Sequence, residues 1–256
     1  MSLRHLILAA AVALPAMTAS AAMAAEEHIA LKQVDWPTNG IFGSFDRAAA
    51  QRGFQVYREV CAACHGLEFV AFRNLATLGY SEDEIKAFAA ELTVTEGPND
   101  EGDMFERPGR PFDQIHGPFP NEQAAAAAHG GKAPPDLSLM AKARAGGPDY
   151  IYSLLTGYED PPAGVEVPDT GSYNAYFPGH IIAMPPPLSD DQVTYADGTS
   201  ATVSQMARDV TEFLVFAAEP KLEDRKGMGL KVMLFLVVLT ALTFALKRKI
   251  WADVPH

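Results

Sequence analysis

The residues with the clearest chemical potential are two cysteines and a histidine in the run Cys61-Ala62-Ala63-Cys64-His65. These two cysteines are the only ones in a chain of 256 residues. Two thiols at this spacing on a helical turn can each add to a vinyl group of haem, and the adjacent histidine then faces the iron. The spacing predicts one haem c, covalently attached through Cys61 and Cys64, with His65 as an axial ligand.

Other chemistries also use a C-x-x-C pair, and each needs a context that the sequence does not show. A thioredoxin-type redox pair lies in a βαβ pattern, and no such pattern surrounds residues 61–65. A zinc site needs two further ligands at regular spacing, and there is no second cysteine pair. Haem attachment is therefore the preferred interpretation.

The iron has one more axial position, which a second side chain can fill. The candidates are His116, His129, His180, Met104, Met140 and Met184. Met184 differs from the others because it follows the apolar residues 181–183 and precedes three prolines. A thioether is a weak ligand that needs a rigid, dry loop, and methionine ligation raises the reduction potential as an electron carrier requires. We expect Met184 to be the second ligand, with His180 as the alternative.

Both ends of the chain have the character of targeting or membrane segments. Residues 1–24 combine Arg4, an apolar run and small residues at the end, as in a secretory signal peptide; the alternative is a first membrane anchor. Residues 227–246 are almost entirely apolar, and a helix of that length rises about 30 Å, the thickness of a hydrocarbon core. The cations that open the tail 247–256 predict a cytoplasmic C-terminus, which leaves residues 25–226 as the exported domain.

The exported domain is more acidic than the whole chain. The full sequence has 20 basic and 32 acidic residues, a formal net charge of −12. One basic residue lies in 1–24, and four basic and one acidic lie in 227–256, so 25–226 holds 15 basic and 31 acidic residues, a net of −16. This charge argues against a nucleic-acid partner, which requires basic surface, and favours a basic protein partner.

Apolar periodicity in the exported domain predicts short helices and no convincing run of strands. Ser44 can cap the first predicted helix, and further helices are predicted to begin at Ser81, Pro148 and Val203. Between them lie long irregular stretches, notably 93–123 and 158–198, which are rich in proline, glycine and acids. Loops of this length are unusual in a compact domain unless something else fills part of the core. We therefore expect a mainly α domain with long irregular loops, followed by one transmembrane helix.

Several segments of the chain resemble a known family. They are 52–65 (RGFQVYREVCAACH), 134–138 (PPDLS), 143–144 (AR), 147–158 (GPDYIYSLLTGY), 173–179 (YNAYFPG), the Met184 loop, 217–221 (AAEPK) and the apolar tail. Together they run from about residue 36 to 251 and resemble the cytochrome c1 family, in its bacterial form. The fold that this resemblance implies is a mainly α, cytochrome c-like haem domain with long irregular loops plus one C-terminal transmembrane helix.

The resemblance also implies roles for individual residues. It makes His65 and Met184 the axial ligands of the iron. It places Arg144 and Tyr150 near the haem propionates, where a cation and a phenol stabilise carboxylates. It places Pro135 in the lining of the haem pocket.

A function and a set of partners follow from the same resemblance. The chain would be the electron-transfer subunit of the cytochrome bc1 complex, ubiquinol–cytochrome c reductase, and would pass electrons from the Rieske iron–sulfur subunit to a basic cytochrome c, soluble or membrane-bound. Cytochrome b and the lipid bilayer would be further partners, and the complex would be a dimer. The chain would cross the bacterial cytoplasmic (inner) membrane once, with the haem domain on the periplasmic side.

Two residues depart from the family pattern. Ala175 stands where a proline is usual, which loosens that loop. His129 stands where asparagine is expected, which leaves its role in the pocket open. The chain also lacks the extra cysteines with which some bacterial relatives form a disulfide.

No nucleophile–base pair or acid–base dyad is visible, so we expect electron transfer without a catalytic site of its own. A group of acids is a plausible docking surface for a basic cytochrome, or simply a solvated loop: Glu91, Glu96, Asp100, Glu101, Asp103 and Glu106. The rival functions are a haem peroxidase with an open axial position, a membrane-anchored thiol–disulfide oxidoreductase, and a free-standing membrane cytochrome c.

Overall fold

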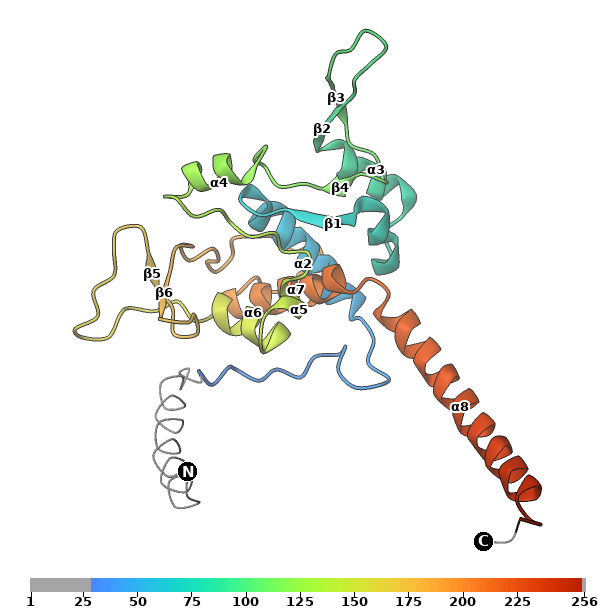
Figure 1. Ribbon diagram of the computed structural model, residues 1–256. Helices are drawn as coiled ribbons and strands as arrows, with labels where there is room; N and C mark the ends of the chain where they lie inside the picture. The colour runs from blue at the N-terminus through green and yellow to red at the C-terminus, as the bar shows by residue number, and fades with distance from the viewer. Residues whose placement is uncertain (1–28, 255–256) are drawn as a thin grey trace, which may run out of the picture. The chain divides into compact units, whose positions relative to one another are not determined.

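The structure is a computed structural model that describes residues 29–254, so the predicted signal peptide lies outside the described residues. Within this part, helices dominate, as expected, and the strands are short (Figure 1). The helices are α2 (Arg47–Glu59), α3 (Glu82–Ala90), α4 (Glu122–Ala128), α5 (Met140–Ala143), α6 (Gly147–Leu155), α7 (Val203–Ala218) and α8 (Leu222–Ile250), with 3-10 turns η1 (Cys61–Ala63) and η2 (Phe72–Leu78). The strands are β1 (Leu67–Ala71), β2 (Thr93–Glu96), β3 (Phe105–Pro108), β4 (Gln114–Ile115), β5 (Ser172–Tyr173) and β6 (Ile181–Ile182).

Local signals set most helix ends. Helix α3 starts at Ser81 as predicted, and Ser81 caps it, because its hydroxyl accepts the Glu84 amide and the Glu84 carboxylate accepts the Ser81 amide. The prediction that Ser44 caps α2 was wrong. Asp46 is the cap, and its carboxylate accepts the Ala49 amide at 3.0 Å. Ser44 instead donates its backbone amide to the Pro37 carbonyl at 3.0 Å, which holds it in the preceding turn.

The core forms where α2 packs on α7. The ring of Phe213 lies 5.3 Å from Phe54 and 5.7 Å from Tyr57, measured between centroids. At Gly53 the two helices touch through their backbones, and a Cβ there would lie 1.9 Å from the Asp209 carbonyl oxygen. Any larger residue would therefore push α2 away from α7.

A buried ion pair joins the same two helices. The Arg52 guanidinium donates to both carboxylate oxygens of Asp209, at 2.9 and 3.0 Å, and Asp209 is fully buried. Gln205 donates a further hydrogen bond to Asp209, and Asp197 accepts one from Arg52. Because the buried charge has several donors around it, the desolvation that would otherwise destabilise it is compensated.

The stretches predicted to be irregular contain some regular structure. Within 93–123, β2 and β3 form an antiparallel hairpin that stands out from the body (Figure 1). The alanine-rich segment that follows this stretch forms α4. The other pairs, β1–β4 and β5–β6, are equally small. Each strand is only two to five residues long, too short for alternating polarity to reveal it.

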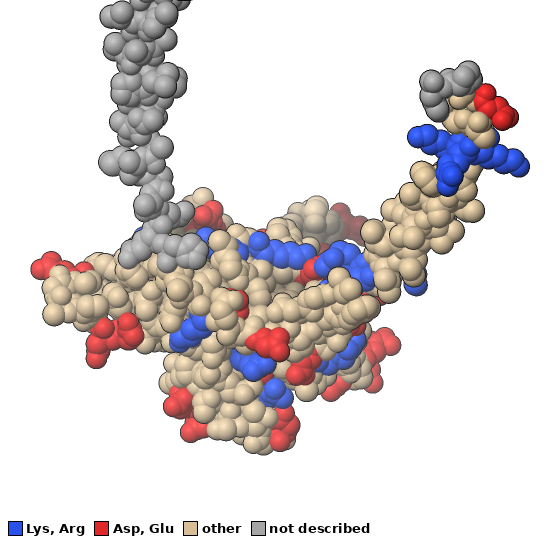
Figure 2. Space-filling view, turned by 90° about the horizontal axis from the view of Figure 1, so that it is seen from below, with Lys and Arg blue, Asp and Glu red and all other residues tan. Residues whose placement is uncertain are grey.

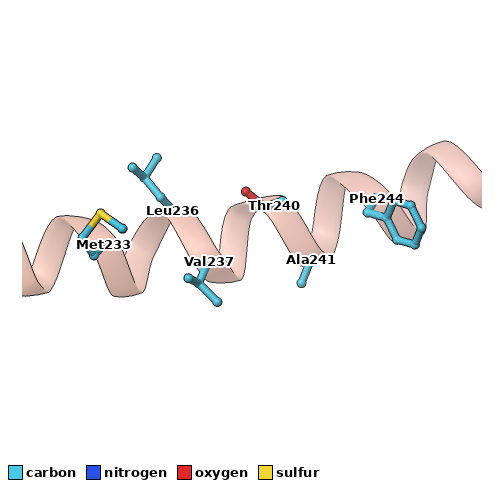
Figure 3. A pocket seen from close by; sticks show the side chains of 6 residues that line it. All are labelled: Met233, Leu236, Val237, Thr240, Ala241 and Phe244. Carbon is cyan, nitrogen blue, oxygen red and sulfur yellow. The ribbon is translucent and has the colours of Figure 1, made fainter.

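Helix α8 is the long apolar element at the C-terminus. Its 29 residues extend beyond the predicted span 227–246 at both ends, and its apolar window has none of its residues buried. Figure 2 shows a rod that is uncharged along its middle, with basic side chains at its far end; the last turn of α8 contains Lys247, Arg248 and Lys249. Met233, Leu236, Val237, Thr240, Ala241 and Phe244 line an open apolar strip along it (Figure 3). The helix fits a single-pass membrane anchor.

One buried carboxyl group, that of Glu212, lacks a hydrogen-bond partner among the described residues. Glu212, on α7, is 1% exposed, and neither of its carboxylate oxygens has a hydrogen-bond partner among the described residues. Burial raises its pKa to about 7, with smaller contributions from the charges of Asp46 and Asp209, while Arg208 acts in the opposite direction. Glu212 is therefore protonated below neutral pH.

This carboxyl predicts a pH-dependent stability. The unfolded chain releases the Glu212 proton near pH 4.5 and the folded chain only near 7, so the stabilising contribution of the protonated group is complete below pH 4.5 and is lost as the pH rises to about 7. We expect Glu212→Gln to gain stability over the parent by about 3 kcal/mol across that window. Denaturant unfolding of the detergent-solubilised full chain at pH 4.5 and 8 measures this gain. The exposed Glu166→Gln is the control, and equal pH slopes in all three proteins would contradict the assignment.

Candidate haem-binding site

Helix α2 delivers the C-x-x-C-H motif directly. The turn η1 begins two residues after α2 ends, and the Cys61 carbonyl accepts the backbone amides of Cys64 at 3.1 Å and His65 at 2.9 Å. Tyr57, on the last turns of α2, donates its hydroxyl to the His65 carbonyl at 3.0 Å. These bonds fix both thiols and the histidine relative to the packed core.

The ring of His65 is oriented by a carbonyl. Its Nδ1 lies 2.7 Å from the Pro135 carbonyl oxygen, and a carbonyl can only accept, so Nδ1 carries the proton. The lone pair is then on Nε2, which is the arrangement that a metal-ligating histidine requires. Burial lowers the pKa of His65 and outweighs the opposing effect of this hydrogen bond. The side chain is therefore held neutral, in one tautomer and one orientation.

The segment that carries Pro135 is itself pinned to the motif. Gly66 accepts the Leu137 amide at 2.9 Å, and the buried Ser138 hydroxyl accepts the Phe69 amide at 3.0 Å. The Asp136 carboxylate accepts the Glu68 amide at 2.8 Å. The PPDLS segment therefore lies alongside the chain that leaves the haem motif.

The setting of Cys61 does not favour a reactive thiol. Cys61 is partly buried against the core, and this burial raises the pKa of its thiol to about 12. A nucleophilic cysteine needs a lowered pKa, because the thiolate is the reactive species. The arrangement therefore argues against thiol–disulfide exchange.

His129, whose role the sequence left open, lies against Cys64. Its Nε2 is 3.3 Å from Cys64 Sγ, and its Nδ1 donates to the Ala125 carbonyl at 2.8 Å. The ring of Phe119 packs edge-on against it, with centroids 5.2 Å apart. His129 is thus a neighbour of the attachment site.

A second group of residues is linked to Met184 through Tyr158. The Tyr158 hydroxyl donates to the Met184 carbonyl at 3.2 Å. Burial raises the pKa of Tyr158, and the nearby Tyr150 adds to this effect. Burial also raises the pKa of Tyr150, which the charge of Arg144 partly offsets. Arg144 itself is exposed and donates to the sulfur of Met140 at 3.4 Å.

The remaining ligand candidates lie in other settings. Met104, at the tip of the β2–β3 hairpin, is 60% exposed, and water would compete for a thioether there. Met140 begins α5, where Arg144 contacts its sulfur. His180 stacks on Tyr173 at 5.7 Å and has a left-handed backbone with φ of 60°. His116 is exposed beside β4.

Sequence reasoning missed two tyrosines of this site. Tyr57 and Tyr158 each place a hydroxyl on the backbone of a predicted ligand, His65 and Met184. Both lie in segments that carry the family resemblance, but a tyrosine in an apolar helix or before a loop is ordinarily a core residue. Only the contact itself reveals the role.

The residues fit a haem. The residues fall into two groups, the thiols of Cys61 and Cys64 with the neutral His65, and the Met184 loop with Tyr150, Tyr158 and Arg144. Among residues 29–254, no hydrogen bond or ion pair joins the first group (Cys61, Cys64, His65, His129 and Pro135) to the second group (Met140, Arg144, Tyr150, Tyr158 and Met184). This donor set matches what a c-type haem requires.

Comparison with known proteins identifies the family of this chain. A family model described as the cytochrome C1 family matches residues 36–254. Cytochrome c1 of Rhodospirillum rubrum is 56% identical over 252 residues, which cover 92% of this chain and 93% of that protein. The mitochondrial cytochrome c1 heme protein of Schizosaccharomyces pombe is 51% identical over 237 residues, covering 93% of this chain and 77% of that one. A cytochrome b/c1 protein of Bradyrhizobium diazoefficiens is 52% identical over 240 residues, 85% of this chain and 35% of that longer protein. The chain belongs to the cytochrome c1 family.

Proposed function

We propose that this chain is the electron-transfer haem subunit of a cytochrome bc1 complex, and that it carries one haem c bound through Cys61 and Cys64. In this role it accepts an electron from a Rieske iron–sulfur subunit and passes it to a basic cytochrome c. The observation that carries the proposal is the hydrogen bond from His65 Nδ1 to the Pro135 carbonyl, next to the two thiols. It leaves Nε2 ready for iron within a motif that fits haem attachment.

The first group of residues attaches and orients the cofactor. Bound there, haem c supplies a one-electron iron couple. Pro135 holds the His65 ring in the ligating orientation, and Tyr57 holds its backbone. Because these contacts exist before any change of redox state, little reorganisation is needed when an electron moves.

The second group supplies the other axial ligand and the propionate partners. Met184 precedes three prolines, and its carbonyl is held by Tyr158, so the loop is constrained from both sides. A constrained thioether stays on the iron and favours the ferrous state. Arg144 and Tyr150 lie near enough to influence each other electrostatically, as partners of one carboxylate would.

The partners are proposed from the family. One relative is named cytochrome b/c1, and another, in Candida albicans, is named as the catalytic subunit of a mitochondrial cytochrome b-c1 complex. By analogy we place this chain beside a cytochrome b and a Rieske subunit in a dimeric complex. Helix α8 would anchor it in a bacterial cytoplasmic membrane, with residues 25–226 on the periplasmic side and the basic tail in the cytoplasm.

The acidic hairpin is the proposed docking surface for the acceptor. Of the six acids suggested by the sequence, Glu91 pairs with Arg58 and Glu96 with Arg107. The other four, Asp100, Glu101, Asp103 and Glu106, are exposed, and no ion pair of theirs occurs in the described residues. Arg107 also binds Asp113 through two hydrogen bonds, which steadies the base of the hairpin. Unpaired acids on a projecting hairpin favour encounter with a basic protein.

Purification from the native membrane tests the function itself. An affinity tag on this chain should recover a cytochrome b, a Rieske protein and quinol–cytochrome c reductase activity, and mass spectrometry should find both cysteines as thioethers. Recovery of a haem-loaded chain alone would favour a free-standing membrane cytochrome. Free thiols would remove the haem proposal altogether.

A methionine substitution tests the second axial ligand. In Met184→Leu, haem should remain attached while its potential falls by on the order of 0.1 V, a fraction of the roughly 0.8 V that axial ligands span. Redox titration and cyanide binding measure the change. Met140→Leu is the matched control, and His180→Ala tests the alternative ligand. An unchanged potential in Met184→Leu would exclude that residue from the iron.

Charge neutralisation tests the docking surface. Changing Asp100, Glu101 and Asp103 to their amides should slow electron transfer to a basic cytochrome c about tenfold at low salt and flatten its salt dependence. Stopped-flow kinetics at several ionic strengths measure this. The control neutralises Glu159, Asp160 and Glu166, three exposed acids in a different loop. Equal slowing in both variants would assign the effect to overall charge rather than to the hairpin.

A further inference from the structure

Two adjacent apolar side chains are presented to solvent by the turn before α2. Ile41 is 74% exposed and Phe42 is 78% exposed, more than any other large apolar side chain among the described residues. Scattered apolar side chains on a surface need no explanation, but an adjacent pair at a turn exposes enough apolar area to favour a partner.

The turn is held rigidly by its neighbours. Trp36 and Phe45, on either side, are 2% and 5% exposed. The Asn39 amide donates to the Trp36 carbonyl at 2.9 Å, and Gly40 adopts a left-handed φ of 70° that closes the turn. Ile41 and Phe42 therefore point outward from an ordered turn.

The same turn is tied to the start of α8. The Lys226 ammonium donates to the Thr38 carbonyl at 2.7 Å and to the Gly43 carbonyl at 3.1 Å, one on each side of the exposed pair. The Glu223 carboxylate accepts the Phe45 amide at 2.9 Å and pairs with Arg47 at 2.8 Å. These bonds therefore fix the position of the turn along the axis of α8, next to its first turn.

Along the axis of α8, the turn lies where the apolar, membrane-spanning stretch begins. The cations at 247–249 mark the far boundary of the apolar stretch, and about twenty helical residues cross a hydrocarbon core, so the near boundary falls at Gly227. Lys226 is the residue just outside it. Figure 2 shows basic side chains on the body where α8 leaves it, as suits a surface facing lipid headgroups. Near the start of α8, Lys221, Asp224 and Arg225 are exposed, and Arg225 pairs with Glu219.

We propose that Ile41 and Phe42 insert into the interfacial region of the lipid bilayer and form a second membrane contact beside α8. The inference rests on α8 spanning the membrane and goes beyond the proposed electron-transfer role. A single helix leaves a domain free to rotate and tilt about it. A second contact, joined to the helix base through Lys226, limits both motions and so holds the haem domain in one orientation above the membrane.

Site-directed spin labelling tests the contact in the haem-loaded full chain. In that protein the two native cysteines are taken up by haem, so Phe42→Cys introduces a single reactive thiol, and labelling of the parent reports separately on the haem proposal. In lipid nanodiscs, the label at position 42 should collide with oxygen, which partitions into lipid, several-fold more than with a water-soluble nickel complex. Ile41→Cys should behave in the same way.

Labels at two reference positions, one expected in water and one expected in lipid, allow the labels at 41 and 42 to be interpreted. Phe69→Cys replaces another exposed phenylalanine, 67% exposed on β1, and should favour the nickel complex. Leu236→Cys lies within α8 and should show the full lipid signature. A lipid signature at 236 with a water signature at 41 and 42 would overturn the proposal while leaving the anchor intact. Loss of both oxygen and nickel contact at 42 in the intact complex would also overturn it, because a membrane subunit would then cover the turn.

Discussion

Helix α2 lies so close to α7 that a side chain at position 53 would meet the Asp209 backbone, and the rest of the structure depends on this approach. The bidentate pair of Arg52 with Asp209 and the aromatic cluster around Phe213 hold the two helices together. The C-terminal end of α2 then delivers the haem motif, and the C-terminal end of α7 leads into α8. One packed helix pair thus relates the redox site to the membrane anchor.

Around this pair, the proposed haem site is built from loops with little regular structure. Carbonyl and hydroxyl contacts replace the missing sheet and helix bonds: Pro135 on His65, Tyr158 on Met184, and Ser138 on the chain after the motif. Long loops are unusual in a compact domain unless something else fills part of the core, and a large apolar cofactor would supply that volume. A bound haem would therefore explain why the irregular segments are so long.

Charge is distributed along the chain according to the surroundings that each part is proposed to meet. Residues 25–226, which we propose are exported, hold 31 of the 32 acids, and four acids on the β2–β3 hairpin form no ion pair among the described residues. The far end of α8 carries the cations, and the apolar pair Ile41–Phe42 lies beside the start of the membrane span. Within the core, the Asp209 carboxylate is compensated by Arg52, whereas Glu212 avoids the cost of a buried charge by keeping its proton.

The sequence by itself determined the features that depend on neighbours along the chain. The helix start at Ser81, the periodicity of α7 and the apolar length of α8 are local, and each predicted its element. The C-x-x-C-H spacing is local too, and the haem attachment it indicates stays a prediction. The start of α2 was misplaced because Ser44 and Asp46 are both good caps, and a hydrogen bond to Pro37 decided between them. Only the tertiary structure decided which carbonyl orients His65, that Tyr158 holds Met184, that His129 contacts Cys64, and that Lys226 ties an apolar turn to the start of α8. These contacts join residues from 26 to 188 positions apart, and no local pattern encodes which distant partner a hydroxyl, ring nitrogen or ammonium will meet.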